Sequence, residues 1–286
     1  MDKFYIITNR LKDPGYETTL AVRDYLQEKG KTCMIQERHE SYGLRDYKYT
    51  NASLIPEDVD CVLAVGGDGT LLQAVRDLVE RKIPLLGINQ GTLGYLAEVD
   101  KSNLKPALDQ LMEGAYTLEE RMMLCGTAYH QGKKLMRDLA LNDIVIGRNG
   151  RLRIIDMNIY VNGAFLNSYC ADGIIVSSPT GSTGYSLSAG GPIVSPEASL
   201  MLLTPIAPHT LNTRSIVLPE DAKITVEIAE GRPSSVEGAE ATFDGDTSVK
   251  LGCGDKIEIC KSDKKARLIK ISNSSFLETL RKKMSG

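Results

Sequence analysis

A glycine-rich turn with a single carboxylate, Gly66-Gly67-Asp68-Gly69-Thr70, has the residue types that could most directly do chemistry. It follows the apolar run at residues 61–65, which predicts a strand, and leads into residues 71–75, which predict the start of a helix. Glycines at such a junction expose backbone N–H groups at the positive end of the helix dipole, where an anion can bind. The turn therefore predicts a phosphate-binding site.

Phosphate binding does not account for the ionisable Asp68 among these glycines. A carboxylate beside a phosphate cradle can hold Mg²⁺ or accept the proton of an attacking hydroxyl, as phosphoryl transfer requires. The structural alternative is an aspartate that caps the N-terminus of the helix that follows. The sequence leaves both interpretations open.

A second glycine turn spans residues 87–96 and again follows an apolar run, at residues 84–88. If the two preceding strands are neighbours in a parallel sheet, the two turns lie side by side at its carboxyl edge, where ligands of such sheets bind. The alternative is an ordinary loop between a strand and a helix.

A third segment, residues 172–192, is rich in hydroxyl groups: seven Ser and Thr residues fall between Ser177 and Ser188. A flexible linker can have this composition. However, the run follows an apolar strand, contains Pro179 and Tyr185, and returns to apolar residues. Short hydroxyl side chains and one aromatic ring suit a ligand made of ribose hydroxyls, an amide and a ring.

Better-known motifs are absent. Gly30-Lys31-Thr32 lacks the leading glycine of a P-loop and follows a helix, and no Gly-x-Gly-x-x-Gly dinucleotide fingerprint occurs. Ser188 replaces the second glycine of a nucleophile elbow. The three histidines have no ligand-spaced neighbours, which argues against a zinc site.

Alternating strands and helices must position the two glycine turns. Apolar runs predict strands at residues 4–8, 32–35, 61–65 and 84–88, and amphipathic stretches predict helices at 17–29, 70–82 and 103–112. This alternation predicts a mostly parallel sheet. The segment at 274–283 predicts a terminal helix.

Beyond about residue 122 the pattern changes to short, β-branched runs separated by turn residues. Strands are predicted at residues 143–147, 153–161, 173–176, 216–218, 223–228 and 257–259. Because no proline-rich linker separates the two halves, we expect them to pack together and leave a ligand cleft between them.

Composition bounds the class of protein. The 286 residues, 42% of them hydrophobic, correspond to about two domains, and the net charge of −3 argues against a nucleic-acid partner. No apolar stretch is long enough for a membrane helix and no leader precedes the first strand, so we expect a cytoplasmic protein. Six scattered cysteines predict reduced, mostly packed thiols.

The order of these motifs resembles that of NAD kinases, which use ATP to phosphorylate the 2′-hydroxyl of the adenosine ribose of NAD. The resemblance covers nearly the whole chain, through residues 66–70, 87–96, 141–143, 172–192, 208–211 and 243–245. The first turn is also found in diacylglycerol kinases and phosphofructokinases. The hydroxyl-rich segment after Asn142-Asp143 distinguishes the NAD kinases.

The resemblance implies roles for individual residues. Asp68 would be the general base, while Gly67, Asp68, Gly69 and Thr70 would surround the phosphates of ATP, which enters with Mg²⁺. The ligands of that ion stay unassigned, with Asp68 as the candidate that the residue chemistry offers. NAD would be bound by Asp68, Gly69, Asn142, Asp143, Arg153, Asp172, Thr183, Gly184, Tyr185, Ser186, Leu187, Ser188 and Asp246. For Arg153, which lies in a basic run, a solvated loop is the alternative.

The resemblance also implies an architecture: a Rossmann-like α/β domain at residues 1–122, a β-sandwich-like NAD-binding domain at 123–260, and a segment at 261–286 that returns to the first domain. It implies a homodimer or homotetramer. Three positions depart from the family pattern: Asp143 replaces glutamate, Gly184 a common alanine, and Asp246 glutamine. The alternatives are a lipid or sugar kinase with the same glycine turn, or a non-catalytic NAD(P) sensor.

Overall fold

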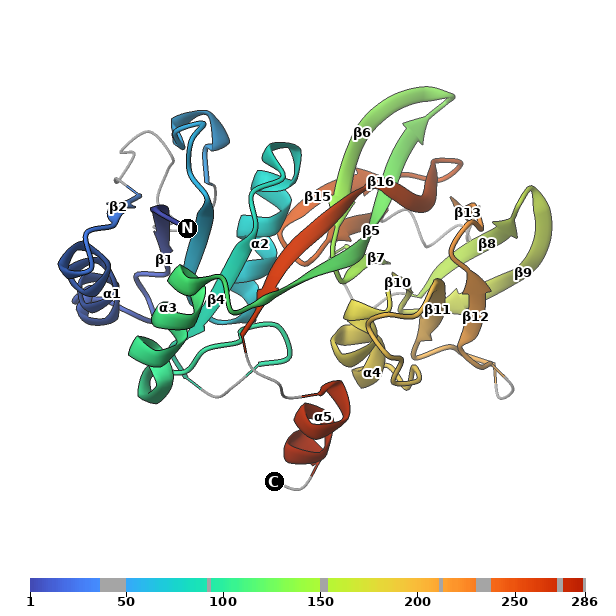
Figure 1. The fold of residues 1–286 in the computed structure, drawn as a ribbon. Helices are drawn as coiled ribbons and strands as arrows, with labels where there is room; N and C mark the ends of the chain where they lie inside the picture. The colour runs from blue at the N-terminus through green and yellow to red at the C-terminus, as the bar shows by residue number, and fades with distance from the viewer. Residues whose placement is uncertain are drawn as a thin grey trace. The chain divides into compact units, whose positions relative to one another are not determined.

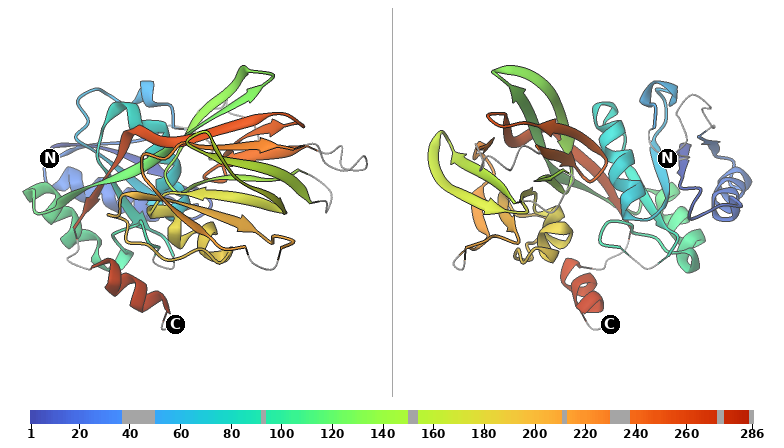
Figure 2. Two further views of the ribbon diagram at one scale, coloured as in Figure 1. Left: turned by 90° about the vertical axis from the view of Figure 1, so that its right-hand side faces the viewer. Right: turned by 180° about the vertical axis from the view of Figure 1, so that it is seen from behind.

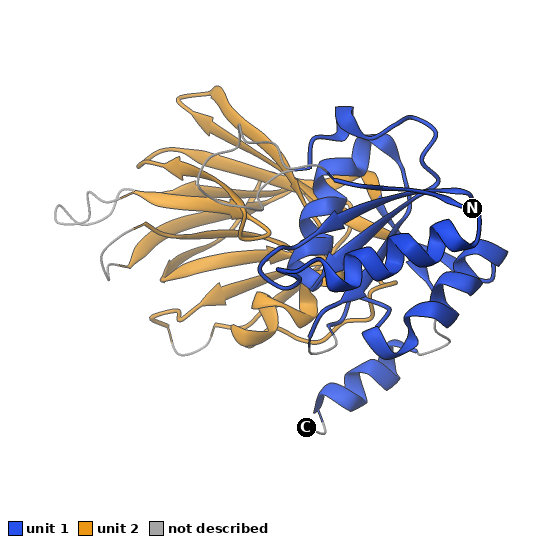
Figure 3. Ribbon diagram, turned by 90° about the vertical axis from the view of Figure 1, so that its left-hand side faces the viewer, with its two compact units in different colours: residues 1–120, 266–286 blue, residues 121–265 orange. Residues whose placement is uncertain are grey.

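Two structural units divide the chain: residues 1–120 with 266–286 form unit 1, and residues 121–265 form unit 2 (Figure 3). The structure, a computed structural model, describes residues 1–36, 50–91, 94–149, 154–210, 213–229, 238–271 and 275–284. Within these ranges no helix is long and apolar enough to cross a membrane.

Unit 1 is built on a parallel sheet with the strand order β2-β1-β3-β4-β16 (Figure 1). The strands are β1 (Lys3–Thr8), β2 (Thr32–Ile35), β3 (Cys61–Gly66), β4 (Leu85–Asn89) and the C-terminal end of β16 (Lys256–Lys270). Every residue of β3 and β4 is buried. Such continuous apolar strands are typical of a parallel sheet covered on both faces.

The helices of unit 1 are α1 (Glu17–Glu28), α2 (Asp68–Leu78), α3 (Leu104–Glu113) and α5 (Phe276–Met284). On α2, one buried face consists of Leu71, Ala74, Val75 and Leu78, which is the spacing of a helix packed on a core. Residues of α1 and α3, including Leu26 and Leu108, join the strands in one hydrophobic cluster.

The register of the sheet brings the strand ends together. Thr8 of β1 pairs with Val65 of β3, and Gly66 of β3 pairs with Asn89 of β4. The loops that follow these three strands therefore leave the sheet at one edge. This confirms that the strands before the two glycine turns are parallel neighbours.

Unit 2 consists of two layers of strands. One layer contains β5 (Thr117–His130), β6 (Lys133–Ala140), β8 (Ile155–Val161), β9 (Ala164–Ala171), β13 (Ile224–Ile228) and the N-terminal part of β16. The other has the order β12-β11-β10-β7-β14-β15 and antiparallel pairing throughout. Its strands are β7 (Asp143–Arg148), β10 (Gly173–Ser177), β11 (Leu200–Ile206), β12 (Ile216–Pro219), β14 (Ala239–Phe243) and β15 (Thr247–Leu251).

Inward-facing residues of both layers form one core. Ile159 and Val226 from the first layer and Ile146, Ile174 and Phe243 from the second are all buried in it. Figure 2 shows the layers with the long β5–β6 and β8–β9 hairpins extending from them. The predicted combination of an α/β unit and a sandwich-like β unit is confirmed.

Candidate active site

The carboxylate of Asp68 lies in the first turn of α2 and binds the second glycine turn. Its Oδ2 accepts a hydrogen bond from the backbone N–H of Tyr95 at 2.8 Å, and its Oδ1 accepts bonds from the N–H groups of Leu96 at 3.3 Å and Ala97 at 3.0 Å. The N-cap of the helix is Gly67. The N-cap interpretation of Asp68 is therefore wrong, whereas the expected proximity of the two turns is confirmed.

Close approach at this point depends on Gly94. A Cβ atom at position 94 would overlap the carboxylate of Asp68. At Gly91, in the same turn, an added Cβ would meet nothing within 4 Å. Glycine is thus needed at position 94 because the Asp68 side chain occupies the adjacent space.

The hydrogen bonds of Asp68 leave little acceptor capacity. A carboxylate offers about four lone-pair sites, and the three backbone N–H groups occupy three of them. About one site is left, which suits the proton of a single hydroxyl group or one bond to a metal. The carboxylate is therefore fixed in position with one acceptor direction open.

The Thr70 side chain stabilises the glycine-rich turn by hydrogen bonds. Its hydroxyl accepts bonds from the N–H of Gly67 at 3.4 Å and from Nδ2 of Asn9 at 3.1 Å, and only 2% of the residue is exposed. Gly69 is exposed, and a Cβ there would meet nothing within 4 Å. The backbone at Gly69 is thus open to a ligand, while the Thr70 side chain shapes the turn.

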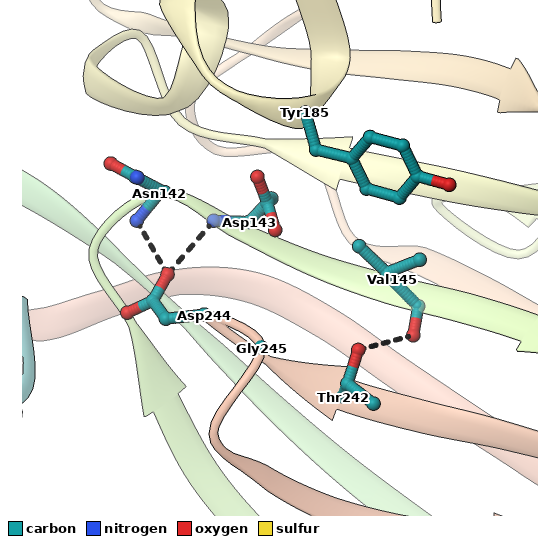
Figure 4. Close-up of a pocket in the computed structure, with 7 residues that line it drawn as sticks. All are labelled: Asn142, Asp143, Val145, Tyr185, Thr242, Asp244 and Gly245. Atoms are coloured by element: carbon teal, nitrogen blue, oxygen red, sulfur yellow. Dashed lines mark hydrogen bonds between the residues drawn. The ribbon is translucent and has the colours of Figure 1, made fainter. Parts of the chain in front are cut away.

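Unit 2 contains a pocket of about 320 Å³. Figure 4 shows its lining residues, which come from position 142 and β7, from β14, from the β14–β15 turn and from α4 (Tyr185–Ser188). The lining residues are Asn142, Asp143, Val145, Tyr185, Thr242, Asp244 and Gly245. Three of these, Asn142, Asp143 and Tyr185, were assigned to NAD binding from the sequence.

Asp244 holds the backbone of residues 141–143 at one side of this pocket, although the sequence analysis assigns it no role. Its carboxylate accepts bonds from the backbone N–H groups of Leu141 at 2.7 Å, Asn142 at 2.8 Å and Asp143 at 3.1 Å. Asp244 and Gly245 have φ values of 50° and 69°, as in a type I′ hairpin turn. The Asp-Gly pair predicts that turn, but not the contact with residues 141–143.

The Asp143 side chain is buried beside a second carboxylate. Only 6% of the residue is exposed. Burial, together with the negative charge of Asp244, raises the pKa of Asp143 to about 7. The neutral form can donate a hydrogen bond as well as accept one.

This pKa predicts a pH dependence of stability. The folded pKa of about 7 lies above the ordinary value of 3.8, so the folded protein holds this proton more tightly than the unfolded chain. The resulting stabilisation is complete below pH 3.8 and is lost as the pH rises through about 7. From pH 5 to pH 8, we expect the free energy of unfolding of the wild type to fall by about 2–3 kcal/mol more than that of Asp143→Asn. Urea denaturation of both proteins at both pH values measures this difference; parallel pH profiles would contradict it.

Asn142 brings an amide to the same pocket. Its Oδ1 is buried and has no hydrogen-bond partner among the described residues. Its backbone carbonyl accepts a bond from the N–H of Ser178 at 2.8 Å, and a Cβ at Gly181 would overlap that backbone. Because buried polar atoms in native proteins are normally bonded, the free amide oxygen favours a ligand that supplies a donor.

The hydroxyl-rich segment is folded, so its interpretation as a flexible linker is wrong. It forms a 3₁₀ turn at Thr180–Thr183, followed by α4. The side chains of Ser177, Ser178, Ser182 and Ser186 are fully buried. They bond within the protein: Ser182, for example, bonds both the N–H and the carbonyl of Val194 at 3.1 Å. These hydroxyls hold the segment in place, and Tyr185 projects from it with 47% exposure.

The other predicted site residues are dispersed in unit 2. Gly184 lies beside the pocket: a Cβ atom added to it would be 3.7 Å from Nδ2 of Asn142. Thr183 is half-buried. Leu187 and Ser188 are exposed, whereas the hydroxyl of Ser186 bonds that of Thr204 at 3.2 Å.

The remaining predicted residues lie outside residues 180–188. Asp172 pairs with Arg148 at 3.5 Å, and Asp246 donates its N–H to the carbonyl of Phe243 at 3.0 Å. Arg153 is outside the described residues.

Unit 1 has a parallel sheet with glycine-rich turns at its carboxyl edge, and unit 2 has a pocket of about 320 Å³ with an amide, two carboxyl groups and a tyrosine in its lining. These features favour the class of nucleotide-using phosphotransferases. Comparison with known proteins agrees. Residues 4–116 match the ATP-NAD kinase N-terminal domain, and residues 141–271 match the ATP-NAD kinase C-terminal domain.

Full-length relatives show the same relationship. The chain is 46% identical to an NAD kinase of Lachnospira eligens, over 99% of this chain and 100% of the relative, and 43% identical to one of Lachnoclostridium phytofermentans, over 99% of each. The solved NAD kinase of Archaeoglobus fulgidus in complex with ATP superposes with a TM-score of 0.77 at 26% identity, covering 99% of this chain and 98% of that one. Yeast NADH kinase complexed with NADH has the same fold, with a TM-score of 0.79 at 21% identity, covering 100% of this chain and 88% of that one.

The chain belongs to the NAD kinase family. It is an enzyme that transfers the γ-phosphoryl group of ATP to the adenosine 2′-hydroxyl of NAD, giving NADP. The match to both domains favours this activity over that of a lipid or sugar kinase with the same glycine turn.

Proposed function

We propose that Asp68 is the general base of this reaction. Its carboxylate accepts the proton of the 2′-hydroxyl while that oxygen forms a bond to the γ-phosphorus and the bond from this phosphorus to the β-phosphate bridging oxygen breaks. ADP leaves, and NADP carries the new phosphate. The observation that supports this most directly is the open acceptor direction of a carboxylate fixed by three backbone N–H groups.

The backbone at the N-terminus of α2 would bind phosphate in this proposal. Gly67 is the N-cap of α2 and Gly69 lies in its first turn, where a helix attracts anions. The N–H of Gly67 is bonded to the Thr70 hydroxyl, so Gly69 is the residue whose N–H would bond the phosphate. Gly69 has no side chain to cover the ligand, and Thr70 maintains the turn through its bond with Gly67. Placing the triphosphate here leaves the unit 2 pocket for NAD.

The unit 2 pocket would bind the adenosine part of NAD. Asn142 supplies an amide with a free buried oxygen, Asp143 supplies a carboxyl group, and Tyr185 supplies a half-exposed ring. An amide can recognise a base edge, a carboxyl group can bond ribose hydroxyls, and an aromatic ring can stack on a base. Thr183, Gly184, Leu187 and Ser188 belong to the segment that carries Tyr185, and Asp246 follows the Asp244–Gly245 turn.

Magnesium would enter this site with the nucleotide. Among the described residues, no group of three or more His, Cys, Asp or Glu side chains could hold a metal ion, and Asp68 has about one acceptor position left. Mg²⁺ is commonly held by one or two carboxylates, substrate phosphates and water, so the residues fit an ion carried mainly by the triphosphate. When bound there, it neutralises charge on the phosphates.

One assay tests the proposed chemistry. Purified protein is incubated with ATP, Mg²⁺ and NAD, and NADP is quantified with and without each component. NADP formation that depends on all three supports the proposal. Binding of NAD without any NADP formation would identify a non-catalytic sensor instead.

Replacing Tyr185 tests the division between the two sites. We expect Tyr185→Ala to raise the KM for NAD by about 2- to 10-fold, because a stacking ring is lost, and to leave the KM for ATP nearly unchanged. Steady-state kinetics with the other substrate saturating measure each constant. Leu135→Ala, on β6, is the matched control because Leu135 is 48% exposed and Tyr185 is 47% exposed. Equal effects of Tyr185→Ala on both substrates would contradict the division.

Two further parts of the proposal concern the whole protein. All six cysteines are free thiols, in accord with an enzyme of the reducing cytoplasm.

A homodimer or homotetramer is supported by β9, a strand at the edge of its sheet, in which Phe165 is 59% exposed and Leu166 is 37% exposed. Light scattering after gel filtration tests the assembly, and a monomeric mass would contradict it.

A further inference from the structure

Unit 1 places a lysine beside the glycine-rich turn. Lys12 lies in the loop between β1 and α1, and this loop leaves the sheet at the same edge as the turn after β3. A Cβ at Gly67 would overlap the Nζ of Lys12. The ammonium group therefore lies against the backbone at the N-cap of α2.

The loop that carries Lys12 is held firmly. The N–H of Asn9 bonds the carbonyl of Val65 at 2.8 Å, and its Nδ2 bonds the hydroxyl of Thr70 at 3.1 Å. Its carbonyl accepts bonds from the N–H groups of Lys12 at 3.0 Å and Asp13 at 2.9 Å. The loop is thus tied directly to the strand and helix that flank the glycine-rich turn.

A second anchor fixes the other end of the loop. Asp13 is 3% exposed, and its carboxylate accepts bonds from the N–H of Thr18 at 3.3 Å and from the N–H and hydroxyl of Thr19 at 2.9 and 2.7 Å. The Lys12 backbone is therefore placed by bonds on both sides.

The charge of Lys12 is also available. Lys12 is exposed, and within the described part of the chain its ammonium group forms no ion pair with a carboxylate. Arg10, two residues earlier, differs: its guanidinium bonds the hydroxyl of Tyr16 and lies 5.2 Å from the centre of that ring. Lys12 is the cation in this loop that is free to meet a ligand at Gly67.

We propose that Lys12 is a phosphate-binding residue of the phosphoryl transfer, with its ammonium group on the β- and γ-phosphates of the nucleoside triphosphate. This inference rests on the proposed assignment of the glycine-rich turn to those phosphates. Lys12 would neutralise charge on the oxygens of the transferred group and on the departing diphosphate, while Asp68 receives the proton of the 2′-hydroxyl. A positively charged group that acts in this way is a recurrent part of phosphoryl-transfer sites.

The pyrophosphate of NAD is the other phosphate group that could meet Lys12. The two sources predict different kinetics, because loss of a lysine on the triphosphate weakens the use of ATP, whereas loss of a lysine on the pyrophosphate weakens the use of NAD. The position of Nζ at the N-cap of α2 favours the triphosphate, which the proposed function assigns to that helix end.

Kinetics of Lys12→Gln provide the test. We expect kcat/KM for ATP to fall by about 10- to 100-fold, the usual range for one charge-assisted bond, and kcat/KM for NAD at saturating ATP to fall by less. Lys12→Arg should recover part of the loss. Lys31→Gln is the control: Lys31 pairs with Asp2 at 2.6 Å and precedes β2, at the opposite edge of the sheet.

Calorimetry separates this inference from the proposed function. We expect Lys12→Gln to bind ATP more weakly than the wild type and AMP equally well, a difference that does not require turnover. A wild type that makes no NADP would overturn the proposed function and leave the calorimetric comparison to decide the role of Lys12. The inference would be overturned if kcat/KM and the Kd for ATP in Lys12→Gln stayed within about twofold of the wild type. It would also be overturned if Lys31→Gln lost as much kcat/KM for ATP, or if Lys12→Gln lost more kcat/KM for NAD than for ATP.

Discussion

Replacing Asp68 by asparagine is expected to lower kcat by at least about 10²- to 10⁴-fold, the usual contribution of a general base, while NAD still binds. Asparagine preserves the size of the side chain but cannot take the proton of the ribose hydroxyl. The variant and the wild type are compared by NADP formation at saturating ATP and NAD, and by direct titration with NAD. Turnover near that of the wild type would eliminate Asp68 as the base.

The same substitution also changes a structural contact, so its interpretation needs a second measurement. Both carboxylate oxygens accept backbone N–H bonds, and asparagine turns one of these acceptors into a donor that faces an N–H group. Unfolding in urea and the affinity for NAD report on this structural effect. A loss of NAD binding as large as the loss of kcat would mean that anchoring the second glycine turn is the main role of Asp68.

The sequence predicts the strands and helices of unit 1 well because their signals are local. Strand β3 is a continuous apolar run, and α2 has its apolar residues spaced by three and four positions. Glycine at the junction between them marks the turn that is proposed to bind phosphate, for the same local reason. The sequence alone is therefore enough to locate the carboxyl edge of the sheet.

The neighbouring position of the two glycine turns could be predicted, but the individual hydrogen bonds between distant segments could not. The bonds from Asp68 to residues 95–97 and from Asp244 to residues 141–143 join parts of the chain that only the folded register brings together. Lys12 gives no signal in the sequence because an exposed lysine in a loop is ordinary. Its position becomes informative only when it is found against Gly67.

The β-rich half contains a strand that the sequence pattern does not predict. Four of the eight residues of strand β6, with the sequence KKLMRDLA, are exposed. Its apolar residues do not alternate with polar ones as they do in a typical half-buried strand. It is formed by its pairing with β5 over residues 124–140. The buried serines of the hydroxyl-rich segment were likewise unpredictable as packing residues, because serine is mostly exposed in proteins.

The close approach of Gly94 to Asp68 makes a second large effect predictable. A methyl group at position 94 would occupy the space of the carboxylate, so in Gly94→Ala the carboxylate has to move or the turn has to open. Displacement of a reacting group by about 1 Å can cost about 10²-fold in rate. We therefore expect kcat of Gly94→Ala to fall by about that factor although every catalytic group is still present, as measured by NADP formation at saturating substrates.

Gly91→Ala is the matched control, because it adds the same methyl group to the same turn where nothing lies within 4 Å. Its kcat is expected to stay within about twofold of the wild type. If both alanine variants lost activity equally, flexibility of the turn would be the cause. If Gly94→Ala kept the wild-type kcat, the position of the Asp68 carboxylate would not limit the reaction. A loss confined to Gly94→Ala would tie catalysis to the placement of that carboxylate, since the two variants differ only in what the added methyl group contacts.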